Sequence, residues 1–518
     1  MGCKIMAKSR SIKNIFKVAI GTFGSRVLGL LRDTLTLAFL GVNAVSSAFF
    51  FGFTIPNLFR RLMGEGALSS AFVPIFSQIL KNEGREKAFV FLNKIITRAL
   101  LILCVLVVSG MAASAIFYFA AQNASERYLL RSAFTSAMMP YMILICLAAL
   151  ICAALNVLGH FALPALTAVW LNVAIISSIL IGAFFAKGDS LGIAKFMCAG
   201  VLCGGAAQLL IPVIQLKFCG WKFRPSLKGS AEVSEFNSLF LPALVGASVI
   251  QANILVSNML ALKVSDIAVS AIYVSSRLVE LPLGIFTFAI ITVYFPKLSL
   301  AAAGGEKSEY ARHFANAVIS LMFICIPASA GLVALAPDVL ELLFQWGKFD
   351  NADVEICSPI LMLGSLGIPF YSLATLSSRG FHSIKDMKTP MAVSAMAFAV
   401  NLTSALLLMR KFGAMGLVGA NVISGIFQAA VLNLAFAKKR EGEKVFAEVA
   451  KILICAVLMG VIIRWASPHV AALASGKLAS LIKVSILVPA GICVYACLLC
   501  IFKFKGFNEV KRLLKRNK

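Results

Sequence analysis

Charged residues are scarce in this 518-residue chain, because Asp, Glu, Lys and Arg together make up only 14% of it. Hydrophobic residues make up 60%, and the mean hydropathy is +0.92. Such a composition excludes an ordinary soluble globular protein and leaves no stretch for a separate soluble domain. It is typical of a polytopic helical membrane protein.

Acidic residues are especially rare, with 22 Asp and Glu against 48 Lys and Arg, for a net charge of +26. Such an excess can indicate a nucleic-acid partner. Here, however, the cations are spread over many short loops and form no single patch with interleaved aromatic residues. The enrichment of Lys and Arg in the cytoplasmic loops of membrane proteins explains them better. We therefore expect no nucleic acid as a partner.

Residues for metal or enzyme chemistry are also few. The four histidines are scattered, and the 13 cysteines lie mostly in apolar segments, where Cys497 and Cys500 form a CxxC by spacing only. The chain has no Walker lysine loop, no Gly-x-Ser-x-Gly elbow and no paired aspartate cluster. We expect no metal site, no cofactor and no enzyme activity.

Long apolar runs are abundant, and runs of about 20 residues can cross about 30 Å of hydrocarbon as helices. Few segments alternate with period two, which favours helices over a barrel. We predict an all-α polytopic membrane protein with about fourteen transmembrane helices. Two spans are long and contain internal prolines, Pro56 and Pro74 in one and Pro282 and Pro296 in the other, where we expect kinks. The predicted spans are 13–41, 45–80, 90–120, 133–158, 162–186, 191–218, 235–262, 267–300, 311–335, 356–381, 387–409, 415–437, 447–466 and 478–503.

The loop cations predict the orientation. An even number of spans puts both termini on one side of the membrane, and the loops on that side hold most of the Lys and Arg. We therefore expect both termini in the cytoplasm. The first apolar run is too long for a signal peptide and contains Arg26 and Arg32, so it is interpreted as an uncleaved span.

Short sequence marks recur in the two halves in the same order and at a nearly constant separation. Such matches predict two homologous six-helix lobes that form a parallel repeat, with the substrate between them. We expect an N-lobe over 1–230, a C-lobe over 231–440, and an added pair of helices with a basic cytoplasmic tail over 441–518. The matched marks are Phe72-Val73-Pro74 with Tyr294-Phe295-Pro296, Pro140-Tyr141 with Pro369-Phe370-Tyr371, Gly159-His160-Phe161 with Gly380-Phe381-His382, and Gly205 and Gln208 with Gly425 and Gln428.

Arginines inside the apolar stretches are the strongest functional signal. A guanidinium at membrane depth costs at least a few kcal/mol, so such residues normally face a bundle interior or a wet cavity. Acidic residues at comparable depth are fewer, which predicts an anionic ligand, and the planar fork of arginine suits phosphate oxygens. The candidate cavity cations are Arg26, Arg32, Arg60 and Arg277, and the candidate supporting residues are Arg61, Asp33, Glu65 and Glu280.

A structural interpretation of the same charges stays open. Asp33 lies seven residues after Arg26 and so returns to its side of a helix. Arg61 and Glu65 have the i, i+4 spacing of a helical ion pair. These residues could be buried ion pairs that hold helices together, although the surplus of cations favours a cation-lined cavity.

Several short motifs along the chain resemble the MurJ (MviN) family, the lipid II flippases of bacterial peptidoglycan synthesis. This family is part of the multidrug/oligosaccharidyl-lipid/polysaccharide exporter superfamily. The chain has Ser47 where the family has an aspartate before an Ala-Phe-Phe run. The motifs are Ser25-Arg26-Val27-Leu28-Gly29 with Arg32-Asp33, Pro56-Asn57-Leu58 with Arg60-Arg61, Glu65-Gly66-Ala67, Ala71-Phe72-Val73-Pro74, Arg277-Leu278 with Glu280 and Pro282, Leu343-Phe344 with Gly347-Lys348-Phe349, and Lys385-Asp386 with Lys388-Thr389-Pro390.

The resemblance implies a fourteen-helix fold with two six-helix lobes around a central cavity, and a final helix pair that forms a groove for the polyprenyl tail. It places the family's functionally required arginines on Arg26, Arg32, Arg60 and Arg277. It implies a flippase of the bacterial inner membrane that moves lipid II from the cytoplasmic to the periplasmic leaflet by alternating access. Lipid II and membrane lipids are then the expected partners, with the cell-wall synthesis machinery as a further candidate.

Other functions compete with this one. An exporter of another lipid-linked oligosaccharide has the same charge requirement. A drug or cation antiporter of the same superfamily would need acidic residues as its main intramembrane charges. A membrane-embedded prenyl-lipid enzyme would need clustered acids or a nucleophile with a base, and a non-transporting scaffold would leave the arginine surplus without a role.

Overall fold

The computed structural model describes residues 24–64, 67–120, 126–437, 445–471 and 477–504. These residues form helices and turns and contain no strand, which confirms the predicted all-α class. The chain divides into two compact units, of which unit 1 is Met1–Leu255 with Trp346–Phe349, and unit 2 is Val256–Gln345 with Asp350–Lys518.

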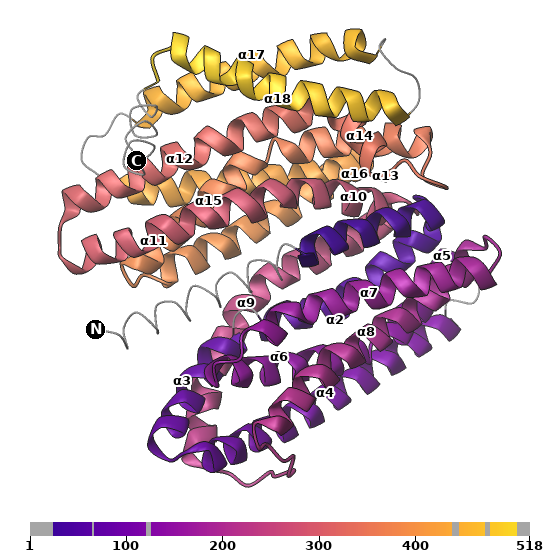
Figure 1. Ribbon diagram of the computed structural model, residues 1–518, viewed down its shortest axis with the longest axis vertical. Helices are drawn as coiled ribbons and strands as arrows, with labels where there is room; N and C mark the ends of the chain where they lie inside the picture. Colours follow the sequence, from indigo (N-terminus) through magenta and orange to yellow (C-terminus); the bar gives the residue numbers. More distant parts are fainter. Residues whose placement is uncertain (1–23, 65–66, 121–125, 438–444, 472–476, 505–518) are drawn as a thin grey trace. The chain divides into compact units, whose positions relative to one another are not determined.

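Unit 1 is a bundle of long apolar helices. In it α7 and α8 pack against each other, while α2 packs on α5 and α6 (Figure 1). Phenylalanine rings fill the interior where α3 meets α4, and Phe72 stacks on Phe76 and Phe91. The helices of unit 1 are 24–40, α2 (Ala44–Gly64), α3 (Ala67–Asn82), α4 (Arg85–Ala120), α5 (Glu126–Met138), α6 (Tyr141–Val157), α7 (Ala162–Phe185), α8 (Ser190–Phe218) and the larger part of α9 (Ala231–Val264).

Unit 2 is also a bundle of long apolar helices. The last two helices, α17 and α18, lie side by side, and α17 packs on α12 (Figure 1). A second aromatic cluster surrounds Phe436, whose ring contacts those of Phe314 and Phe381. The remaining elements are α10 (Ala268–Pro282), the π-helix η1 (Leu283–Thr287), α11 (Phe288–Ala303), α12 (Lys307–Ala334), α13 (Ala336–Phe344), α14 (Asn351–Ser365), α15 (Ile368–Ser383), α16 (Lys388–Ala437), α17 (Val445–Ala471) and α18 (Lys477–Ile501).

Ten helices in the described ranges are long and apolar enough to cross a membrane, which agrees with a multi-pass protein. The count of fourteen stays a prediction. One of the ten, α16, covers two predicted spans, and Gly413 with φ of 55° interrupts its helical backbone between them. The discontinuity expected at Pro282 is present, because a π-helix begins directly after it. Pro56 and Pro74 lie inside α2 and α3, and the kinks expected at these two prolines stay predictions.

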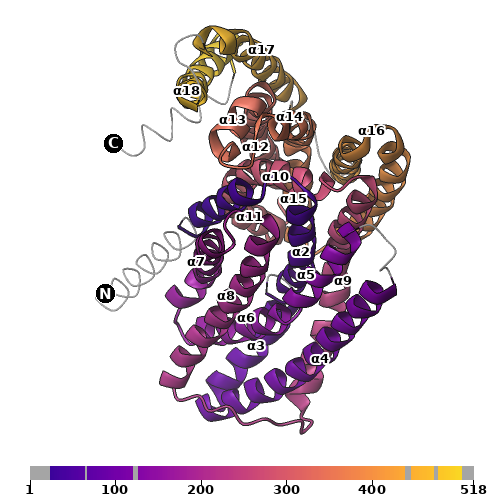
Figure 2. The same ribbon diagram turned by 90° about the vertical axis from the view of Figure 1, so that its right-hand side faces the viewer.

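Two matching contacts support the repeat. In unit 1 the Tyr141 ring lies against Gly205, where an added Cβ would come within 2.5 Å of the ring, and in unit 2 the Tyr371 ring lies equally close to Gly425. Both pairs were matched marks in the sequence. In Figure 2, α6 and α8, which carry Tyr141 and Gly205, run beside each other. The lobe boundaries at 230 and 440 stay predictions.

The same repeat positions also carry related hydrogen bonds. Gln208 Nε2 donates to the carbonyl oxygen of Thr167, and Gln428 Nε2 donates to Ser394 Oγ. Each glutamine lies three residues after the glycine of its unit, and each bond joins consecutive long segments. In both units, a glutamine at the matched position therefore donates to the preceding helical segment, through a backbone carbonyl in unit 1 and a hydroxyl in unit 2.

A loop between α13 and α14 belongs to unit 1. Lys348 N donates to the carbonyl oxygen of Ala38 at 2.7 Å, and Lys348 Nζ donates to Gly188 O at 2.5 Å and Ser190 Oγ at 2.7 Å. Gly347 has φ of 59° and lies directly against the Ala38 carbonyl. This loop closes over the end of helix 24–40 and the turn between α7 and α8.

Candidate functional site

Helix 24–40 carries the first two candidate arginines. Its end is set locally, since Gly41 adopts φ of 74°, a left-handed conformation that commonly ends helices. Asn43 then starts α2, because its Oδ1 accepts hydrogen bonds from the backbone N–H groups of Val45 and Ser46. Arg26 is exposed and Arg32 is half-buried.

Arg32 is held by a network that crosses to α7. Its Nη2 lies 2.6 Å from Asp33 Oδ1 and its Nε lies 3.0 Å from the same oxygen. Its Nη1 donates to Asn172 Oδ1 at 3.1 Å, and Asn172 Nδ2 donates to the carbonyl oxygen of Ser25 at 3.0 Å. Asp33 is 3% exposed and Asn172 is 5% exposed. The buried amide of Asn172 therefore orients the Arg32 guanidinium and also binds helix 24–40 at Ser25, two turns before Arg32.

The candidates on α2 lie after Pro56. Arg60 Nε donates to Asn57 Oδ1 at 2.7 Å, one turn earlier on the same helix. Arg60 and Arg61 are both half-buried. Glu65 lies outside the described residues. Arg60 therefore lies in an apolar helix and has an uncharged amide, that of Asn57, as a hydrogen-bond partner.

Arg277 lies on α10, directly before the π-helix of unit 2. Its Nη1 lies 3.1 Å from Glu280 Oε2, its Nη2 donates to Tyr273 Oη at 2.8 Å, and its guanidinium lies 4.5 Å from the centre of the Tyr273 ring. Tyr273, Arg277 and Glu280 share one face by their helical spacing. A π-helical turn within a helix is frequent at functional sites, and here it follows within two turns of Arg277.

The structure thus pairs several of the predicted residues and adds others. It joins Arg32 with Asp33, and Arg277 with Glu280. Asn172 and Tyr273 did not emerge from the sequence. A single asparagine in the apolar run 162–185 was a signal that could have found Asn172, since polar side chains at membrane depth are costly unless they have a partner. Tyr273 could have been found from its i, i+4 spacing to Arg277.

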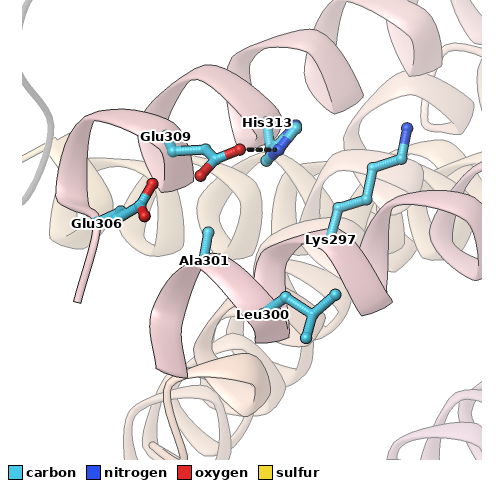
Figure 3. A pocket seen from close by; sticks show the side chains of 6 residues that line it. All are labelled: Lys297, Leu300, Ala301, Glu306, Glu309 and His313. Atoms are coloured by element: carbon cyan, nitrogen blue, oxygen red, sulfur yellow. Dashed lines mark hydrogen bonds and ion pairs between the residues drawn. The ribbon is translucent and has the colours of Figure 1, made fainter. Parts of the chain in front are cut away.

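A pocket of about 200 Å³ lies at the turn between α11 and α12 (Figure 3). Its lining carries both signs of charge, and Glu309 Oε1 faces His313 Nε2 at 3.2 Å. A hydrogen bond with Glu309 and the negative charge of that residue raise the pKa of Glu306. None of the candidate arginines lines this pocket. The lining residues are Lys297, Leu300, Ala301, Glu306, Glu309 and His313.

Metal chemistry has no evident place in the ranges that the structure covers. There, no three His, Cys, Asp or Glu side chains gather in a way that could hold a metal ion. The candidate site therefore consists of guanidinium groups with amide, carboxylate and phenol partners. The guanidinium groups can bind anions, and the amide, carboxylate and phenol partners orient them.

Comparisons with known proteins agree on one family. The family model described as "Lipid II flippase MurJ" matches residues 37–483. The chain is 29% identical to the "Probable lipid II flippase MurJ" of Thermotoga maritima over 504 residues, which cover 97% of this chain and 99% of that protein. It is 31% identical to the protein of the same name from Vibrio cholerae over 445 residues, which cover 83% of each chain.

Solved structures show the same likeness. The structure titled "Lipid II flippase MurJ, inward closed conformation" matches with a TM-score of 0.78 and 28% identity, and covers 94% of this chain and 98% of its own. An inward-facing multidrug resistance MATE family transporter of the MOP superfamily matches with a TM-score of 0.64 over 82% of this chain and 95% of its own. At 13% identity this second match shows the fold alone.

Proposed function

The chain belongs to the lipid II flippase MurJ family, and on that premise we propose that it translocates lipid II from the cytoplasmic to the periplasmic leaflet of the bacterial inner membrane for peptidoglycan synthesis. The observation that carries the proposal is the family match over residues 37–483. It is a transporter and not an enzyme. The drug-antiporter alternative loses its support, because the MATE likeness shows only the fold.

The arginines are the proposed ligands of the lipid headgroup. Arg26, Arg32, Arg60 and Arg277 bind the pyrophosphate and nearby polar groups of lipid II, since a guanidinium offers two parallel N–H donors to phosphate oxygens. Each charge-assisted hydrogen bond contributes about 1.5–3 kcal/mol, less where water competes.

The local partners suggest how binding and release alternate. Arg32 already donates two hydrogen bonds to Asp33, so a phosphate that binds this guanidinium competes with the carboxylate. Glu280 stands in the same relation to Arg277. An exchange between carboxylate and phosphate keeps each guanidinium paired at every stage of transport, which avoids the cost of a bare charge at membrane depth.

We further propose alternating access with both termini in the cytoplasm and fourteen spans. The lobes over 1–230 and 231–440 and the C-terminal pair over 441–518 remain part of this proposal. An inside-negative potential favours outward movement of the anionic headgroup by about 2.3 kcal/mol per charge per 100 mV. The cell-wall synthesis machinery is the proposed further partner.

The test is complementation of a bacterium depleted of its lipid II flippase, scored by the lipid II that becomes accessible in the periplasm. The wild-type chain should restore translocation, whereas Arg26→Ala and Arg277→Ala should not, at matched membrane levels. Arg410→Ala is the matched control, because Arg410 is an exposed arginine at the end of a predicted span. It should behave as wild type.

The outcomes separate the function from the site. A wild-type chain that inserts normally but does not restore translocation overturns the proposed substrate. If the wild type works and the two arginine variants also work, lipid II translocation stands and the proposed headgroup ligands are wrong.

A further inference from the structure

The linker between α8 and α9, residues 219–230, is fixed along α4 by its main chain. Asn93 Nδ2 donates to the carbonyl oxygen of Lys222 at 2.9 Å, and Ser226 N donates to Thr97 Oγ1 at 3.1 Å. Arg98 Nη2 donates to the carbonyl oxygens of Leu227 and Lys228 at 2.8 and 3.0 Å. The side chain of Trp221 packs inward against α4, whereas the side chains of Lys222, Arg224, Leu227 and Lys228 are exposed.

Three of these side chains are exposed cations within seven residues: Lys222, Arg224 and Lys228. In the described part of the chain none of the three forms an ion pair. The nearest acid along the chain, Glu232, has Lys94 and Lys87 as its electrostatic partners. Arg98 adds a fourth positive charge, and its bonds go to carbonyl oxygens. The cluster therefore keeps its full positive charge.

The depth of this cluster follows from α4. Beyond Arg98 the sequence carries no charged residue until Glu126, and an exposed apolar face begins at Leu101 and continues through Val105, which is 68% exposed. In a membrane protein such a face contacts lipid. Arg98 thus marks the level at which the hydrocarbon ends, and it holds the linker at that level. Leu227, which is 59% exposed, lies among the cations at the same level.

We infer that the linker surface, formed by Arg98, Lys222, Arg224 and Lys228 with the exposed Leu227, binds the phosphate headgroups of anionic membrane phospholipids. Unpaired cations at the edge of the hydrocarbon match a lipid phosphate in charge and in depth. The exposed Leu227 side chain would contact the acyl chains next to the headgroup. Binding there would fix the connection between α8 and α9 at the membrane surface. This inference does not depend on the transported substrate.

The test uses the tryptophan that lies at the linker. Trp221 donates to Asn93 and is one of four tryptophans, so Trp170→Phe, Trp346→Phe and Trp465→Phe leave it as the only reporter. The chain is reconstituted in phosphatidylcholine bilayers that contain brominated phosphatidylglycerol or brominated phosphatidylcholine. Quenching of Trp221 then gives the relative affinity of the two lipids at the linker.

The affinity of the linker for phosphatidylglycerol should exceed that for phosphatidylcholine by at least about five-fold, because one basic residue near an anionic membrane surface contributes about that much. High salt should weaken the preference. The variant Lys222→Gln/Arg224→Gln/Lys228→Gln should lose it. The matched control Lys307→Gln/Lys385→Gln/Lys388→Gln removes the same charge from exposed sites in unit 2 and should keep it.

A preference that survives in the linker variant, or that disappears equally in the control, overturns the inference. Unchanged Trp221 emission and thermal unfolding show that the linker variant is folded. Undecaprenyl pyrophosphate supplies a further arm. The two lipids are compared at the same total negative charge in the bilayer. If undecaprenyl pyrophosphate then displaces phosphatidylglycerol from the linker, the surface is a site for polyprenyl pyrophosphates and the assignment to bulk phospholipid is wrong.

Discussion

Asn172 on α7 binds Arg32 on helix 24–40, with 3.1 Å between Asn172 Oδ1 and Arg32 Nη1. The same amide donates to the carbonyl oxygen of Ser25, so both ends of the amide are used. An Asn amide that accepts from one group and donates to another has a fixed orientation. Asn172 therefore sets the direction in which Arg32 presents its remaining donors.

Asn172→Ala should lower both stability and transport. It leaves the Ser25 carbonyl and one guanidinium donor without this partner, at a cost of about 1–3 kcal/mol. Asn172→Asp loses the donor to Ser25 and adds a negative charge, but it keeps an acceptor for the positively charged Arg32, so it should retain more transport than Asn172→Ala. Thermal unfolding in detergent and the complementation assay measure the two effects. Val173→Ala is the control on the exposed side of α7; equal losses in this control and in Asn172→Ala would refute the role given to the amide.

Gly347→Ala should destabilise the loop between α13 and α14, which belongs to unit 1. The residue has φ of 59°, and an added Cβ would overlap the Ala38 carbonyl. A left-handed alanine costs about 1–2 kcal/mol, and the overlap adds about 1–3 kcal/mol. Gly84→Ala is the matched control, because Gly84 has φ of 87° and open space around it. The free energy of unfolding should fall about twice as far for Gly347→Ala, and similar losses would disprove the tight contact.

The ion pair between Asp338 and Lys483 should couple α13 to α18. Their atoms lie 2.7 Å apart, Asp338 is 3% exposed, and Ser467 on α17 also donates to this carboxylate. Asp338→Leu alone leaves the Lys483 charge without its partner and should cost about 3–5 kcal/mol. Asp338→Leu/Lys483→Met should recover most of that loss, because both charges are gone. A double-mutant cycle of unfolding free energies checks this, and additive losses would show that the pair is not coupled.

The repeat predicts equal responses at Gly205 and Gly425. Alanine at either position pushes a Cβ to 2.5 Å from a tyrosine ring, Tyr141 or Tyr371, so each should lose about 1–3 kcal/mol through overpacking. Gly331→Ala is the control, because no atom lies within 4 Å of its added Cβ. In the last turn of α12 it should be neutral or stabilise by up to about 1 kcal/mol. A large loss at one glycine of the pair and none at the other would contradict equivalent packing in the two units.

Much of the architecture was predictable because it depends on local pattern. Apolar runs of sufficient length identify helices, and this pattern located α4, α7, α8, α12, α17 and α18 to within a few residues. Pro282 predicted an interruption, since proline removes a backbone donor, and a π-helix follows it. The repeated marks that contain Tyr141 and Gly205 were also visible, because both units use the same contact.

Other features depended on which helices face each other, and hydropathy does not encode that. Asp33 has the spacing to share a face with Arg26, yet the structure pairs it with its neighbour Arg32. Position 140 divides one predicted span into α5 and α6, and another span divides near Gly367 into α14 and α15. Both divided spans exceed the length of a single crossing by little, so length alone gave no sign of the break.

The sequence by itself determined the all-α class and the family, and it predicted arginines at membrane depth and an internal repeat, because periodicity, hydropathy and motifs are properties of short stretches. Only the tertiary structure decided that Asn172 orients Arg32, that Lys348 closes over the end of helix 24–40, and that α4 holds the linker through its main chain. Each of these contacts joins residues more than a hundred positions apart. Their formation depends on the packing of whole helices, and no local pattern specifies it.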